Sequence, residues 1–319
     1  MGARRGYWRR RVVRGIVTGR YRMSIAAPWP ASVTAALAGL AGAHTDVERL
    51  GGMSGATVWR ARLPRHSFIV KASPRPTERR FYESVAATLR QHAIASPTLH
   101  QAVEEDGVHW LVLEDIASPL PRDRWLADPD LLATLRRLHA IEWSEAFELP
   151  DAFVPRWSGE MTGRALSCVP DAVATPMASL LRDFASASQH LFHPLAPISG
   201  DPNPSNWGIR PDGTLVLFDW ERFSRGTPPL DLAITVPGLG DPADYALVAA
   251  RYLAKPGAEP GLPAAIEHLA REIGLAKVWT VVEFLNGHTL NPSERTKPMV
   301  EFLIPTLPAW LKTLNHARS

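Results

Sequence analysis

Two acidic side chains and one amide are spaced as a metal-binding and proton-accepting group would require. Asp201 and Asn206 lie five residues apart in a polar loop, and Asp219 follows a predicted strand, Thr214–Phe218. A turn at Asp212-Gly213 lets this strand pair with the segment that begins at Asn206, so we expect Asp219 to lie close to Asn206. Such oxygen ligands suit Mg²⁺, which takes few protein ligands and keeps phosphate and water.

A lysine and a glutamate upstream could complete this chemistry. Phosphoryl transfer needs an acid that accepts the hydroxyl proton, metal ions that bridge the phosphates, and a cation for the phosphates that are not transferred. Lys71 could be that cation, and it lies on a predicted strand, Ser67–Ala72. Glu78 follows in the first turn of a predicted helix, where it could pair with Lys71.

A glycine-rich turn, Gly51–Ala56, lies between two predicted strands. It contains Gly52, Ser54 and Gly55, and its backbone N–H groups could approach a phosphate without interference from Cβ atoms. The turn lacks the G-x-G-x-x-G spacing of glycine-rich nucleotide-binding loops. Taken alone, it is weak evidence for a phosphate site.

The elements that must position these residues fall into two parts. Up to residue 116 the pattern predicts a short helix, three strands, a longer helix and a hairpin. In order these are Ala31–Leu40, Val47–Leu50, Thr57–Leu63, Ser67–Ala72, Thr77–Gln91, Val103–Glu105 and Val108–Ile116. After residue 116 the pattern predicts mainly helices. These are Leu131–Ile141, Ala178–Leu191, Tyr245–Leu253, Pro263–Ile273, Lys277–Leu285 and a stretch from Pro298.

Four segments together resemble one family of small-molecule kinases. The loop Ser199–Asn206 resembles the H-G-D-x-x-x-x-N loop of the aminoglycoside phosphotransferase and choline kinase-like family, whose members are relatives of protein kinases. Phe218–Glu221 resembles its I-D-W-E segment, and Asp231–Ala233 resembles its D-L-A segment. Leu111–Ile116 resembles its adenine-binding hinge. Because these pieces occur in the family's order, the chain resembles the family over roughly residues 45–290.

The resemblance implies an α+β, bilobal protein-kinase-like fold. Its small lobe would be an antiparallel β-sheet with one helix, and its larger lobe would be mostly helical. The implied activity is ATP- and Mg²⁺-dependent transfer of the γ-phosphoryl group to a hydroxyl of a small molecule, with ATP between the lobes. Fold-level resemblance does not identify that acceptor.

The resemblance also implies roles for single residues. Asp201 would be the catalytic base, and Asn206 and Asp219 would be magnesium ligands. Lys71 would contact the α- and β-phosphates, with Glu78 as its partner. The other implied nucleotide-binding residues are the turn residues Gly52, Ser54 and Gly55 and the hinge residues Glu114, Asp115 and Ile116.

Ser199 departs from the family pattern, because the family usually has a histidine there that supports the catalytic loop. Loop positioning could therefore be weaker without loss of the reaction. Asp231 and His139 are interpreted as structural residues, and Asn203 as a turn residue, whereas a metal-binding role for Glu221 stays open. Candidates for an acceptor pocket are Trp157, Trp279, Glu283 and Phe284.

Positive charge is concentrated at the N-terminus. Eight arginines lie within the first 22 residues, and no acidic residue precedes Asp46. Subtracting these eight charges from the net charge of +3 leaves −5 for the rest. We expect a basic, disordered tail over 1–30, a nucleotide-binding domain over 31–116 and a helical domain over 117–319. A solvated extension, a start at Met23 instead of Met1, a targeting segment, and a segment that binds nucleic acid or a membrane surface remain open interpretations of the tail.

The composition narrows the class of protein. Of 319 residues, 45% are hydrophobic and 21% are charged, as in soluble globular proteins. No apolar run approaches the roughly 18 residues of a membrane helix. With one cysteine, Cys168, no internal disulfide can form, and a reduced cytoplasm is the default location. The main alternative function is a nucleotide-binding pseudokinase scaffold. The expected partner is a small-molecule hydroxyl substrate; no membrane partner is expected, and no nucleic acid except through the basic tail 1–22. The sequence leaves the oligomeric state and the preference for ATP or GTP open.

Overall fold

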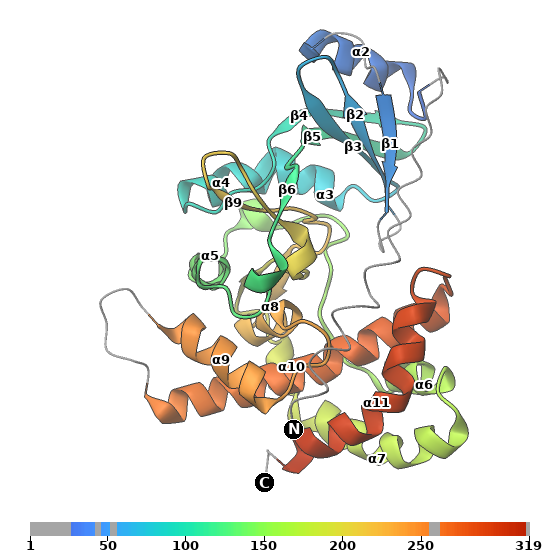
Figure 1. Ribbon diagram of the computed structural model, residues 1–319, viewed down its shortest axis with the longest axis vertical. Coiled ribbons are helices and arrows are strands. Elements are labelled where there is room, and N and C mark those ends of the chain that lie inside the picture. The colour runs from blue at the N-terminus through green and yellow to red at the C-terminus, as the bar shows by residue number, and fades with distance from the viewer. Residues whose placement is uncertain (1–26, 42–45, 52–55, 255–261, 317–319) are drawn as a thin grey trace. The chain divides into compact units, whose positions relative to one another are not determined.

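The computed structural model describes residues 27–41, 46–51, 56–254 and 262–316 (Figure 1). Contacts divide the chain into two compact units. One unit holds residues up to Arg79 together with Pro97–Asp115, and the other holds Arg80–Ser96 together with residues from Ile116 onward. The expected domain boundary after residue 116 lies one residue from the second division, whereas residues 80–96 group with the second unit.

The first unit is built on a five-stranded antiparallel sheet. Its strands are β1 (Asp46–Leu50), β2 (Thr57–Arg62), β3 (Ser67–Ser73), β4 (Leu99–Glu105) and β5 (Val108–Glu114), in the order β1-β2-β3-β5-β4. The β4–β5 turn is Asp106-Gly107, where both residues have positive φ, 53° and 72°. This is the two-residue turn whose twist matches paired strands. The expected strands and hairpin are therefore present.

A helix, α2 (Ala31–Ala41), packs on this sheet through Val33 and Leu37, which are buried one turn apart (Figure 1). Three tryptophans continue the same core. Trp29 meets Trp59 edge-on at 6.1 Å between ring centroids, and Trp59 stacks on Trp110 at 5.9 Å. The sheet is thereby covered on the face that α2 occupies.

The helical segment after β3 carries the chain from the first unit into the second. It consists of α3 (Thr77–Arg80), a π-helical turn (Phe81–Val85) and α4 (Ala86–Gln91). The predicted helix Thr77–Gln91 is confirmed, and the expected apolar face is buried at Phe81, Val85 and Leu89. In the second unit, Phe81 stacks on Trp220 with ring centroids 4.5 Å apart.

In its described residues, the second unit is mostly helical and carries two small sheets. Its helices are α5 (Pro129–His139), α6 (Gly159–Ser167), α7 (Asp171–Ala187), α8 (Pro228–Thr235), α9 (Pro242–Leu253), α10 (Pro263–Leu290) and α11 (Lys297–His316). One sheet pairs β6 (Ser118–Pro119), β8 (Trp207–Ile209) and β9 (Leu215–Leu217), and the other pairs β7 (Ala196–Ile198) with β10 (Ser224–Gly226). Short 3₁₀ turns occur at Arg122–Arg124, Glu145–Phe147, Gln189–Phe192 and Pro204–Asn206.

Several helices of this unit differ from the expected ones. The two helices expected over Pro263–Ile273 and Lys277–Leu285 form one 28-residue helix, α10, which packs against α6, α7, α8, α9 and α11. Surrounded in this way, α10 is buried on several faces and lacks the single apolar stripe that sequence patterns detect. The helix expected from Ala178 begins seven residues earlier, and α6 and α8 were not predicted because both are short.

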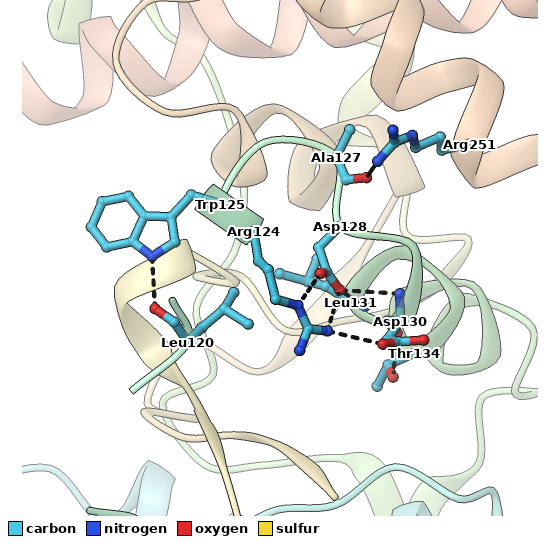
Figure 2. A network of polar contacts seen from close by, with 9 residues as sticks. All are labelled: Leu120, Arg124, Trp125, Ala127, Asp128, Asp130, Leu131, Thr134 and Arg251. Atoms are coloured by element: carbon cyan, nitrogen blue, oxygen red, sulfur yellow. Dashed lines mark hydrogen bonds and ion pairs between the residues drawn. The ribbon is translucent and has the colours of Figure 1, made fainter. Parts of the chain in front are cut away.

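The N-terminus of α5 is fixed by a charged cap (Figure 2). Asp128 Oδ1 accepts hydrogen bonds from the backbone N–H groups of Asp130 and Leu131, at 3.1 and 3.0 Å. Arg124 Nε donates to Asp128 Oδ2 at 2.6 Å, and Arg251 of α9 donates to the carbonyl of Ala127 at 2.5 Å. These bonds satisfy the first amides of α5 and attach it to α9.

Candidate active site

The loop between β7 and β8 is held through its backbone N–H groups by a side chain of α8. The N–H groups of Ser199 and Gly200 donate to the carboxylate of Asp231 on α8, at 2.8 and 2.9 Å. Gly200 has φ +77°, and a Cβ there would lie 2.3 Å from the carbonyl oxygen of Arg222. Only glycine fits both conditions, so the position before Asp201 does not accept a side chain.

Asn206 is bonded directly to Asp201. Asn206 Nδ2 donates to the Asp201 carbonyl at 3.0 Å and to Asp201 Oδ2 at 3.1 Å. Both partners are acceptors, so the amide nitrogen must face them and Oδ1 must face away. Asn203 accepts hydrogen bonds from Ser205 N–H and Oγ, which is the behaviour of a turn residue.

The β8–β9 hairpin returns the chain toward Asn206. Trp207 pairs with Leu217, and the N–H of Phe218 donates to the carbonyl of Asn206 at 3.0 Å. Asp219 is the next residue, and its φ of +65° places it in the left-handed region, which aspartate tolerates better than most residues. The structure therefore brings Asp201, Asn206 and Asp219 into one region, as their spacing predicts.

The carboxyl of Asp201 lies in an unusual electrostatic environment. Burial raises the pKa of Asp201 to about 6, although Arg222 opposes the rise and Asp219 adds to it. A largely enclosed acid next to a second acid is a place where a cation would be stabilised. It is also an acid whose pKa lies closer to neutrality than that of a free carboxyl, which suits a general base.

Asn206 and Asp219 fit a Mg²⁺ ion by their chemistry. Both offer hard oxygen donors, and the amide of Asn206 turns Oδ1 away from Asp201, where it can act as a ligand. Within the described residues, no three His, Cys, Asp or Glu side chains are placed to hold a metal ion. Mg²⁺ does not need such a group, because one or two protein oxygens with phosphates and waters commonly bind it.

Lys71 and Glu78 form an ion pair inside the first unit. Lys71 Nζ lies 2.5 Å from Glu78 Oε2, and both side chains are buried. Lys71 is in the middle of β3, opposite Leu111 of β5, so the sheet fixes its backbone. A buried pair of this kind holds the ammonium in one place, because separating the charges would leave one of them uncompensated.

The side chains of the hinge residues already have partners. The Asp115 carboxylate accepts hydrogen bonds from Arg60 Nε and Ser67 Oγ, both at 2.7 Å. Glu114 Oε2 accepts one from the N–H of Thr98 at 3.0 Å. Both side chains are therefore already engaged in hydrogen bonds within the first unit. In the second unit Ile116 packs against Gly208, and Gly52, Ser54 and Gly55 lie outside the described residues.

Sequence reasoning missed a charged residue beside Asp201. Arg222 Nη2 binds both carboxylate oxygens of Glu283 on α10, at 2.6 and 2.8 Å. Its guanidinium also stacks on Phe153, 3.9 Å from the ring centroid. Glu283 was a candidate for the acceptor pocket, and the only signal for Arg222 was its place three residues after Asp219.

The other candidates for the acceptor pocket are mainly packing residues. Trp279 is buried and donates its indole N–H to the carbonyl of Arg156 at 2.9 Å. Trp157 is buried and donates to Thr162 Oγ1 at 2.8 Å. Phe284 is half-buried.

Comparison with known proteins identifies the family and the fold. A family model described as the phosphotransferase enzyme family matches residues 46–268. A search of curated proteins finds no match. Among solved structures, the chain is similar to a spectinomycin phosphotransferase in complex with ADP and spectinomycin, at 12% identity and TM-score 0.55, over 85% of this chain and 93% of that chain.

Two other solved structures show the same fold. An ethanolamine kinase from Plasmodium vivax has 13% identity and TM-score 0.55, over 84% of this chain and 83% of that one. A choline kinase from Streptococcus pneumoniae has 20% identity and TM-score 0.50, over 88% and 98%. These likenesses show an α+β, kinase-like fold, with the five-stranded sheet in the N-terminal part and a mostly helical remainder. Because the family model spans well over half of the chain, the protein belongs to the phosphotransferase enzyme family.

Proposed function

We propose that the protein transfers the γ-phosphoryl group of ATP, with Mg²⁺, to a hydroxyl of a small molecule. The observation that carries the proposal is the Asp201–Asn206 pair, which lies on a loop anchored by Asp231 and is followed by Asp219 at the end of the β8–β9 hairpin. This set supplies an acid for the hydroxyl and oxygens for a metal ion, which are the groups that phosphoryl transfer needs.

Asp201 would orient the acceptor hydroxyl and take its proton. Its carboxylate is held from one side by Asn206 Nδ2, so it presents a defined oxygen to a bound hydroxyl. Burial raises the pKa of Asp201 to about 6, which makes it a better proton acceptor than an ordinary aspartate while it stays ionised at neutral pH. Mg²⁺ held by Asn206 and Asp219 would neutralise charge on the phosphate oxygens.

The first unit would supply the nucleotide contacts. Lys71, fixed by Glu78, would bind the phosphates that are not transferred. The hinge backbone at Asp115 would bind the base, because the Asp115 carboxylate is held by Arg60 and Ser67. Nucleotide use is supported by two similar structures, the spectinomycin phosphotransferase with ADP and an aminoglycoside phosphotransferase with AMP-PNP and hygromycin B.

An acceptor screen would test the proposal. Purified protein is given ATP, Mg²⁺ and a library of hydroxyl compounds that includes antibiotics, amino alcohols and sugars, and ADP release is measured. We expect Asp201→Asn to lower kcat by at least about 100-fold, because general-base catalysis contributes that much or more. We expect Asp219→Ala to abolish Mg²⁺-dependent nucleotide binding in calorimetry.

Asp212→Asn is the matched control. It removes the charge of an exposed acid in the β8–β9 turn, and the amide oxygen can still accept from the Thr214 N–H. Activity should be unchanged in this variant. Binding of Mg-ATP without turnover on any hydroxyl, and with no effect of Asp201→Asn, would instead support the pseudokinase scaffold.

In the described part of the chain, no helix is long and apolar enough to cross a membrane.

A further inference from the structure

An ion pair and an aromatic ring meet beside the loop that carries Asp201. Arg222 Nη2 binds both carboxylate oxygens of Glu283, and the guanidinium carbon lies 3.9 Å from the centroid of the Phe153 ring. The three side chains come from the segment after β9, from α10 and from the loop before α6, all within the second unit. The guanidinium is the group that joins the other two.

This cluster lies against the residue that precedes Asp201. A Cβ at Gly200 would lie 2.8 Å from the Cβ of Arg222, so these two positions are in close contact. Burial raises the pKa of Asp201, Arg222 lowers it, and Glu283 adds to the rise. Both charges of the pair therefore act on the proposed base. An acceptor whose hydroxyl reaches Asp201 would bring its neighbouring groups close to Arg222.

Glu283 and Phe153 together have the chemistry of a cation-binding site. The carboxylate attracts a cation by its charge, and the ring attracts it by the negative potential of its face. Both are engaged by the protein's own guanidinium. The side chains of Arg222 and Glu283 are 31% and 20% exposed, so a molecule in the solvent can approach the pair. An ammonium group that arrived there would meet a like charge.

Stability alone does not account for the placement of Arg222. Its Nε is buried and has no hydrogen-bond partner among the described residues. An N–H group that is removed from water without a partner costs free energy. This arginine is therefore placed less favourably than one that served only to join two segments and had all its donors satisfied.

We propose that Arg222 determines acceptor specificity by occupying the cation site that Glu283 and Phe153 form. Its guanidinium repels an ammonium group and engages the two side chains that would bind one. An anionic group would have to compete with the Glu283 carboxylate. The favoured acceptor is therefore an uncharged hydroxyl compound, and amino alcohols are disfavoured. The specificity rests on the proposed function, whereas occupation of the cation site does not.

Removal of the arginine side chain should open the cation site. The probe is ethylguanidinium, which corresponds to the part of the side chain that Arg222→Ala removes, and its binding is measured by NMR titration. We expect Arg222→Ala to bind the probe at least about 10-fold more tightly than the wild type, because the carboxylate and the ring face both become available. Adding Glu283→Gln to this variant should remove most of the gain.

Arg225→Ala is the matched control. The guanidinium carbon of Arg225 lies 5.0 Å from the centroid of the Trp143 ring, and among the described residues Arg225 forms no ion pair. Its removal frees an aromatic face without a carboxylate, so affinity for the probe should stay as in the wild type. Circular dichroism checks that each variant is folded. Arg222→Gln, which removes the charge and keeps a donor for Glu283, replaces the alanine variant if that variant is unfolded, and should show a smaller gain.

The acceptor screen tests the specificity itself. Uncharged compounds are paired with amino analogues, such as glucose with glucosamine, at a pH where the amine is protonated. We expect the wild type to favour the uncharged member by at least about 10-fold in kcat/KM, and Arg222→Ala to lower this preference by a similar factor. A preference of the wild type for the amino compounds would overturn the proposal.

The binding experiment separates this proposal from the proposed function. Equal affinity for ethylguanidinium in the wild type, in Arg222→Ala and in the double variant would show that Glu283 and Phe153 form no cation site, and would overturn the proposal. Absence of phosphotransfer in the wild type, with the gain in probe binding intact, would contradict the proposed function and leave the occupied cation site established.

Discussion

Two fully buried serines of the second unit differ in one respect. Ser199 Oγ is buried without a hydrogen-bond partner among the described residues, whereas Ser188 Oγ donates to the carbonyl of Ala185 at 3.1 Å. Removing an unpaired hydroxyl recovers its desolvation cost, and removing a paired one loses a bond. We expect Ser199→Ala to change the free energy of unfolding by zero to about +1 kcal/mol, and Ser188→Ala to lower it by about 1 kcal/mol. Urea denaturation measures both.

The Ser199 comparison also bears on the family pattern. If Ser199→Ala destabilised the protein as much as Ser188→Ala, the hydroxyl would have a partner that its surroundings do not show. Replacement by the family's histidine must fit an imidazole into a position with no exposed surface, and overpacking of this kind costs about 1–3 kcal/mol. A stable, more active Ser199→His variant would require rearrangement around the loop.

The Lys71–Glu78 pair allows stability and nucleotide binding to be separated. Glu78→Gln removes the carboxylate that pairs with a buried ammonium, and we expect a loss of about 3–5 kcal/mol of stability. Replacing both residues, as Lys71→Met with Glu78→Leu, removes both charges and should restore most of that stability. Binding of Mg-AMP-PNP should stay lost in the double variant because the cation is gone. Denaturation and calorimetry measure the two effects, and recovery of binding in the double variant would exclude Lys71 as a phosphate contact.

The grouping of site residues that lie close together in the sequence could be predicted. Contacts between residues that lie far apart in the sequence could not. Asp201, Asn206 and Asp219 fall within one loop and hairpin, so their spacing alone placed them together. Arg222 could not be recognised, because its partner Glu283 lies 61 residues away on a different helix. The link from His139 to Asp231 spans 92 residues and is invisible to spacing for the same reason.

At the scale of elements, one buried lysine joins two helices. Lys277 of α10 donates to the carbonyls of Ala233 and Val236, at 3.0 and 2.7 Å, and so caps the C-terminus of α8. Burial lowers the pKa of Lys277 to about 7. The unfolded chain keeps this proton up to a pH near 10, so between those values the unfolded state binds more protons than the folded state. The contribution of Lys277 to the free energy of unfolding is therefore lowest below pH 7 and rises from pH 7 to 10.

Lys277→Met tests this linkage. The methionine retains most of the packing volume and removes the buried charge. We expect the variant to be at least as stable as the wild type at pH 6, and to lose the part of the rise in stability between pH 7 and 9 that comes from Lys277. Urea denaturation at several pH values measures the slope in both proteins. Identical slopes would mean that the two carbonyls hold the ammonium charged throughout this range.

Elements that carry their own local signal were predicted, and elements defined by packing were not. The strands of the first unit alternate and are separated by clear turns, such as Asp106-Gly107, so their order was readable. In contrast, α8 has eight residues, begins at two prolines, and is stabilised by Lys277 from α10. Its helical state depends on tertiary contacts that no local pattern contains.

At the scale of the whole molecule, the fold class was predictable because separate family segments occur in order along the chain. The acceptor was not predictable, because the surroundings of Asp201 include residues from distant parts of the chain. Arg222 is one of them, and it pairs with Glu283 of α10 and stacks on Phe153. The order of the segments is enough to predict the fold class, whereas function has to be argued from the site itself.

The basic N-terminal segment can be removed to test whether it contributes to function. A chain that starts at Met23 loses eight arginines, so its net charge changes from +3 to −5, and it retains every described residue. We expect Mg-AMP-PNP affinity and the unfolding midpoint to stay unchanged, because the sheet core from Trp29 onward and the catalytic loop are intact. Any affinity for nucleic acid should disappear with the positive charge and should fall steeply with salt in the full chain. Calorimetry and a fluorescent oligonucleotide titration at two salt concentrations measure these effects. Nucleic-acid binding that survives the truncation would place the basic site in the folded part of the chain.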